Sequence, residues 1–165
     1  MLDIIILIVS GALAYAGLSR TLTGIVHWTR PAPRFLREFY HPRRRSGRLS
    51  AWLYAIATVA ALFTFGASLV RLFGPGPAFF PWAAGALCLV LCAAAGMGLI
   101  LSRKIGTDQL ESGIAEQWSL EKHVSREHDD EVDLFDAARH CNRAVPWLLW
   151  EALLLAACLP IYIWL

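Results

Sequence analysis

Four long apolar runs constrain this chain more than any other feature of its sequence. The last run, Ala144 to Leu165, contains a single charged residue, Glu151. An α-helix rises about 1.5 Å per residue, so a run of this length crosses a bilayer core of about 30 Å. The other three runs cover about residues 2–18, 51–72 and 80–101. The sequence therefore predicts an all-α membrane protein, a bundle of four transmembrane helices.

The composition favours a single membrane domain over residues 1–165. Hydrophobic residues make up 57% of the chain, charged residues only 17%, and the mean hydropathy is +0.50. An average soluble domain is about 25% charged. Between the runs lie two long connections, residues 19–50 and 102–143, and one short loop, residues 73–79. These segments are too short and too divided for a second globular domain.

The distribution of positive charge predicts the topology. Of the 15 Lys and Arg residues, all except Arg71 fall in the two long connections. Because positive loops stay in the cytoplasm, we expect both connections inside and both ends of the chain outside. The excess of Arg over Lys, with abundant Ala and Leu, favours a bacterial protein. The predicted location is therefore the inner membrane, with multiple passes.

Glu151 is the one ionisable group that the sequence places well inside a predicted span. A charge at a helix centre costs about 2.5–3.5 kcal/mol on insertion scales, so such residues usually face a bundle interior. Tyr15, Tyr54 and Thr58 lie at a similar depth, and we expect them to form an intramembrane polar cluster with Glu151. Three interpretations stay open: a protonatable group on an ion path, a protonated residue that joins helices, or a side chain reaching the near surface.

Two rows of small residues predict where the helices pack. Small side chains let helix backbones approach closely in lipid, where packing rather than the hydrophobic effect holds helices together. In each row the small residues recur every four positions. The rows are Ala60, Thr64 and Ser68 in the second run, and Ala84, Cys88, Cys92 and Gly96 in the third.

The two long connections carry opposite charge and predict cytoplasmic amphipathic helices. The first is basic, and its arginines are expected to meet anionic lipid: Arg34, Arg37, Arg43, Arg44 and Arg45. The second is acidic and has apolar residues at helical spacing. We expect this apolar face to dock a partner protein through Leu110, Ile114, Trp118, Val132 and Phe135.

The ionisable side chains do not follow a known catalytic or metal-binding spacing. Histidine and acidic residues gather in the second connection, but no HExxH, CxxC or EF-hand pattern is present. No histidine lies at membrane depth to activate Ser68 as a nucleophile. We therefore expect no catalytic residue, no metal, no cofactor and no nucleic acid.

The sequence predicts a non-catalytic inner-membrane subunit. We expect it to assemble into a homo-oligomer or a larger membrane complex, and to dock a cytoplasmic partner through its acidic segment. One alternative is a small proton- or ion-coupled transporter or channel that uses Glu151. A second alternative is a metal or redox subunit of a membrane complex.

Overall fold

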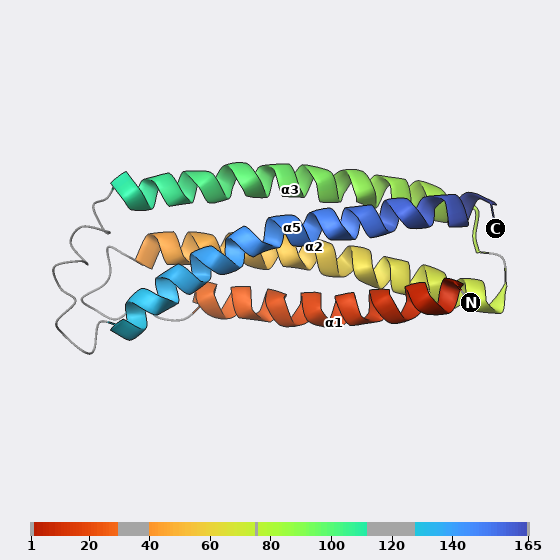
Figure 1. Cartoon of the computed structure of the whole chain (residues 1–165), viewed down its shortest axis with the longest axis horizontal. Coiled ribbons are helices and arrows are strands. Elements are labelled where there is room, and N and C mark those ends of the chain that lie inside the picture. The colour runs from red at the N-terminus through yellow and green to blue at the C-terminus, as the bar shows by residue number, and fades with distance from the viewer. Residues whose placement is uncertain (1, 30–39, 75, 112–127, 165) are drawn as a thin grey trace.

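The computed structural model describes residues 2–29, 40–74, 76–111 and 128–164, and every regular element in them is an α-helix. The four helices are α1 (Leu2–Thr29), α2 (Tyr40–Phe73), α3 (Phe80–Glu111) and α5 (His128–Trp164). They run up and down along one long axis (Figure 1). The start of α1 and the end of α5 lie beside the short connection between α2 and α3, which we call the turn end. The two long connections lie at the opposite end, the loop end (Figure 1).

Each helix contains a segment that is long and apolar enough to cross a membrane. These segments are Asp3–Thr29, Arg44–Phe73, Phe80–Lys104 and Arg139–Ile161. Their mean hydropathies lie between 1.7 and 2.4. The prediction of an all-helical protein with four membrane-length apolar helices is confirmed, and the chain is described below as a multi-pass membrane protein.

The helices extend beyond the apolar runs of the sequence. The first run stops near Leu18, but α1 continues through Arg20 to Thr29. At the other end of the chain, α5 begins at His128, well before the fourth apolar run, and Pro146 lies inside the helix. A charge or a proline ends an apolar run, but neither ends a helix whose side chains and backbone are satisfied by neighbouring helices.

The core lies where α2, α3 and α5 meet. The antiparallel pairs α1–α2 and α3–α5 make the most extensive contacts, although α5 diverges from α3 towards the loop end (Figure 1). Helix α2 contacts all three other helices. Alanine and leucine side chains fill most of this core, among them Ala57, Ala84, Leu91, Leu148 and Leu155. The small side chains keep the helices close together, as expected when packing rather than the hydrophobic effect holds them.

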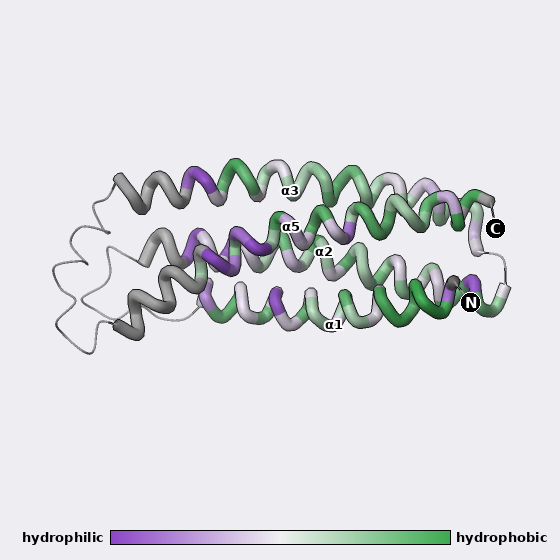
Figure 2. The backbone as a smooth tube through the Cα atoms, viewed as in Figure 1, coloured by the Kyte–Doolittle hydropathy of each residue, from purple (hydrophilic) through white to green (hydrophobic). Residues whose placement is uncertain are grey.

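Large apolar side chains cover the outside of the bundle instead of its interior. Ile8 is 66% exposed, Leu89 is 74% exposed and Leu153 is 62% exposed. Figure 2 shows hydrophobic residues along most of the described length, with hydrophilic residues concentrated towards the loop end. An apolar outer surface around a core of small residues fits lipid as the surrounding solvent.

An arginine ties three helices together at the turn end. Arg71 of α2 donates a hydrogen bond through Nη1 to the carbonyl oxygen of Ile161 in α5. Its Nε lies 3.6 Å from Oδ1 of Asp3 in α1, which forms an ion pair. These contacts join the last turn of α2 to the start of α1 and the end of α5.

Candidate functional site

Arg20 is a half-buried charged side chain in the loop-end half of the bundle. Its guanidinium carbon lies 4.0 Å from the centre of a Trp147 ring and 5.7 Å from the centre of the Tyr54 ring. Such cation–π contacts contribute about 0.5 kcal/mol when exposed and about 2 kcal/mol or more when desolvated. Because the three residues come from α1, α2 and α5, this stack connects three helices.

Two histidines surround the same place. The ring nitrogen Nε2 of His140 lies 2.9 Å from the carbonyl oxygen of Arg20. The hydroxyl of Tyr54 donates a hydrogen bond to the carbonyl oxygen of His140 at 3.3 Å. The His27 and His140 rings lie 6.0 Å apart, and the Tyr54 and His140 rings 4.8 Å apart. We call Arg20, His27, Tyr54, His140 and Trp147 the crossing cluster.

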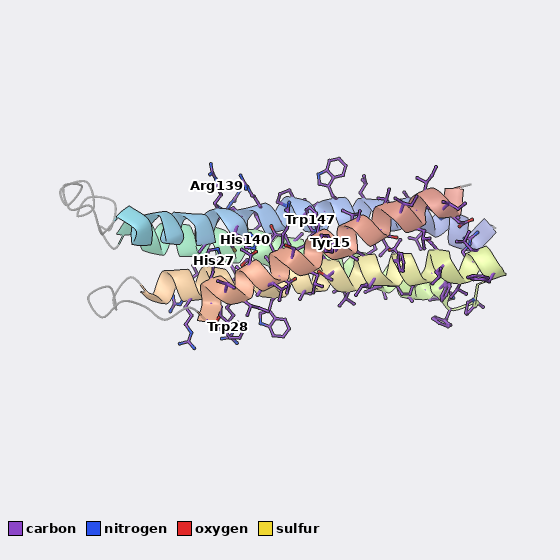
Figure 3. All side chains as sticks on the ribbon, turned by 90° about the horizontal axis from the view of Figure 1, so that it is seen from below. Tyr15, His27, Trp28, Arg139, His140 and Trp147 are labelled. Carbon is purple, nitrogen blue, oxygen red and sulfur yellow. The ribbon has the colours of Figure 1, made fainter. Side chains whose placement is uncertain are left out.

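The crossing cluster lies where α1 passes α5. Arg20 meets Trp147, and His27 meets His140 (Figure 3), so a step of seven residues along α1 matches an equal step along α5 in the opposite direction. The two helices therefore run antiparallel with a fixed register here.

Glu151 is the most deeply buried acidic side chain that the structure describes. It is 2% exposed, and its Oε1 has no hydrogen-bond partner. A charged carboxylate left without a partner in an apolar interior is very unfavourable. The burial of Glu151 is therefore unfavourable for its charged form.

The predicted polar cluster around Glu151 is divided in the structure. Thr58 is buried, but its hydroxyl donates to the carbonyl oxygen of Tyr54 at 2.7 Å, as helical threonines commonly do. The hydroxyl of Tyr54 bonds to His140 instead of Glu151. Tyr15 is 78% exposed, because its neighbours Ala14 and Gly17 occupy the face of α1 that meets the bundle. None of the three hydroxyls bonds to Glu151 among the described residues.

The small-residue row of α2 lies in the interior. Ala60 and Thr64 are each 1% exposed, and Ser68 is fully buried. The hydroxyl of Thr64 donates to the carbonyl oxygen of Ala60 at 3.0 Å, so its polarity is satisfied within its own helix.

The small-residue row of α3 turns away from the core along its length. Ala84 is fully buried, and Cys88 donates a hydrogen bond through its thiol to Ala152 of α5 at 3.6 Å. Cys92 and Gly96 are exposed. A helix has 3.6 residues per turn, so each step of four adds about 40° and three steps add about 120°. The row therefore begins inside the bundle and ends outside it.

Most residues predicted to meet a partner or lipid lie outside the described part of the chain. Ile114, Trp118, Arg34 and Arg37 belong to undescribed segments, and the side chains of Leu110, Val132, Phe135 and Arg43 are likewise not described. Arg44 and Arg45 are exposed at the loop end of α2.

The sequence does not predict the crossing cluster, because Arg20 and the histidines lie outside the predicted spans. One feature of the sequence points to the cluster. Arg20 is a single arginine between the first apolar run and residues 21–29, and these residues continue the same helix. The contact between Trp147 and the guanidinium depends on the register of α1 against α5.

The described residues contain no group of three or more His, Cys, Asp or Glu side chains placed to hold a metal ion. Comparison with protein-family models, curated proteins and solved structures gives no match.

Proposed function

We propose that this chain is a non-catalytic subunit of a membrane assembly, joined to a neighbouring helix through the outer side of α3. Gly85, Cys92 and Gly96 share that side of the helix, and we call these three residues the outer stripe. An added Cβ at Gly85 or at Gly96 would meet no atom within 4 Å. Open space at both glycines would let the backbone of another helix approach closely. This observation carries the proposal.

The proposed partners are a second copy of the chain or another membrane subunit, and a cytoplasmic protein. The docking of that protein through the acidic segment rests on the sequence pattern of Leu110, Ile114 and Trp118. The proposed orientation places the loop end in the cytoplasm and the ends of the chain outside, in the inner membrane of a bacterium. It is supported by the exposed basic residues of the loop end, among them Arg48, Arg103, Lys104, Arg139 and Arg143.

Cysteine crosslinking tests the outer stripe. Cys92 is exposed on it, whereas Cys141 and Cys158 are 2% exposed. Mild oxidation of membranes containing the full chain should produce a covalent dimer, or an adduct with another subunit, through Cys92. The Cys92→Ala variant should lose this product, and Gly96→Leu should reduce it several-fold by keeping the neighbouring helix away.

Cys88→Ala is the matched control, because Cys88 turns towards α5 and its removal should leave the crosslink intact. A product that persists in Cys92→Ala would contradict the proposal. So would a purified chain that has the native mass of a monomer and co-purifies with no other subunit.

A second candidate function is transport of a proton or ion through Glu151. The specific observation in its favour is a carboxyl group that is 2% exposed and has an unpartnered oxygen. Buried ionisable groups inside membrane spans commonly mark ion pathways. Proteoliposomes that contain the full chain should then show pH-dependent flux that Glu151→Gln abolishes. Thr64→Val, another buried polar site, should keep the flux. Absence of flux, or equal flux from Glu151→Gln, would reject this candidate.

A further inference from the structure

Arg20 has a fixed position and unused hydrogen-bonding capacity. Stacking at 4.0 Å on Trp147 holds its guanidinium near the surface of the bundle, and the side chain is half-buried. Among the described residues no carboxylate forms an ion pair with it. A guanidinium presents several N–H donors in a planar fork that matches phosphate and carboxylate groups. Arg20 also hydrogen-bonds the side chain of Tyr54, and its remaining N–H donors are left for an anion.

Two further arginines stand beside this position on α5. Arg139 and Arg143 are both exposed, and neither forms an ion pair within the described part of the chain. Arg143 lies close enough to Tyr54 and His140 for its charge to act on both, as does the charge of Arg20. Figure 3 shows Arg139 extending away from the helices on the side opposite Trp28. Arg20 and Arg143 thus both lie near Tyr54 and His140, and Arg139 adds a positive charge one helical turn from Arg143.

The surface next to these charges, towards the middle of the membrane, is apolar. Trp150 follows Arg143 by seven residues, which places both on one side of α5 about 10 Å apart along the axis. Its side chain is 70% exposed. An anion that binds Arg20 and Arg143 would therefore have apolar surface directly below it. A headgroup with attached acyl chains fits this arrangement, whereas a water-soluble anion would leave the apolar surface uncovered.

We propose that the α1–α5 crossing binds the phosphate group of an anionic phospholipid. Arg20 and Arg143 donate hydrogen bonds to the phosphate oxygens, Arg139 adds positive charge, and an acyl chain lies along Trp150. Guanidinium–phosphate pairs are charge-assisted and can be bidentate, which makes them stronger than neutral hydrogen bonds. The site is separate from the five arginines of the first connection and does not depend on the proposed assembly through α3.

Native mass spectrometry of the full chain in mild detergent tests the site, with phosphatidylglycerol and phosphatidylcholine as probes. The wild type should retain phosphatidylglycerol in preference to phosphatidylcholine. Each basic residue near a membrane surface contributes about 1 kcal/mol, so each arginine removed should weaken binding roughly fivefold. The double variant R139Q/R143Q should therefore lose roughly 25-fold. Both side chains are exposed, so this variant should still fold.

R48Q is the matched control, because Arg48 is also an exposed loop-end arginine but lies 5.8 Å from the ring of Trp28, away from the crossing. It should change binding less than twofold. R20K, which keeps the charge but loses the planar fork, should weaken binding. The proposal is overturned if R48Q and R139Q/R143Q lose equal affinity, or if both lipids bind equally. Displacement of the lipid by millimolar inorganic phosphate would overturn the assignment to a lipid.

Discussion

The seam between α1 and α2 and the outer stripe of α3 both consist of small residues, but only the seam is filled. At Gly24 an added Cβ would lie 2.7 Å from the backbone nitrogen of Ala51, and at Gly47 it would lie 2.6 Å from that of Trp28. At Gly85 and Gly96 it would meet nothing within 4 Å. The same residue type thus marks a completed contact in one region and an open surface in the other. Small residues show where a helix can be approached, and the structure shows whether anything in this chain approaches it.

The α1–α2 seam follows the geometry of closely packed antiparallel helices. The buried positions on α1 are Ile6, Ser10, Ala14, Gly17 and Gly24, at steps of four, four, three and seven residues. These steps follow the helical repeat of about 3.6 residues, so the positions stay on one side of the helix over several turns. The α3 row has a strict step of four and therefore drifts out of the core. Replacing single glycines with alanine measures this difference. The three variants below are ordered from the largest to the smallest expected loss of unfolding free energy.

Gly24→Ala should have the largest effect. Its new Cβ would meet both the nitrogen and the Cα of Ala51, and backbone atoms cannot move away without separating the helices. Overpacking of this kind typically costs about 1–3 kcal/mol. Reversible unfolding in mixed detergent micelles should show a lower free energy of unfolding than the wild type. An unchanged value would mean that α1 and α2 do not lie this close together.

Gly17→Ala should have an intermediate effect, because the obstacle is a side chain. The new Cβ would lie 2.6 Å from Oγ1 of Thr58, whose hydroxyl is part of a flexible group. We expect a loss of about 1 kcal/mol, towards the lower limit for overpacking. The double variant Gly17→Ala/Thr58→Ala should recover most of this loss in the same unfolding measurement. Lack of recovery would show that Thr58 is not the residue that restricts this position.

Gly96→Ala should have the smallest effect on folding. Its Cβ would enter open space, and alanine favours a helix over glycine by up to about 1 kcal/mol. The unfolding free energy of the monomer should stay equal or rise slightly. A clear loss of stability in the monomer would show that the outer stripe is covered by part of this chain, which would remove the contrast with the seam.

The presence of four membrane-length apolar helices follows from the sequence alone. A backbone in lipid must satisfy its own hydrogen bonds, so an apolar run of sufficient length leaves a helix as the available structure. The ends of the helices do not follow in the same way. Arg20 interrupts the apolar run, but α1 continues because Trp147 provides a surface for the guanidinium. That contact depends on the register between two helices far apart in the chain, which composition and periodicity do not encode.

The candidate site shows the same limit. The sequence identifies Glu151 as the ionisable residue within a span, and the structure buries it to 2% exposure. Its surroundings depend on which sides of α1 and α2 turn inward, and a rotation of about 100° per residue separates Tyr15 from the buried face of α1. The depth of a residue along a helix follows from its residue number, because the rise per residue is constant. The direction in which its side chain points depends on how the helices pack.

The proposed topology has four helices crossing the membrane, with the arginine-rich loop end inside the cell. Labelling of a Gly74→Cys variant, in a chain whose native cysteines are replaced by alanine, tests this topology most directly, because Gly74 is exposed at the turn end. A membrane-impermeant maleimide added to intact cells should modify this cysteine. Modification only after the cells are opened would place the turn end inside and contradict the account.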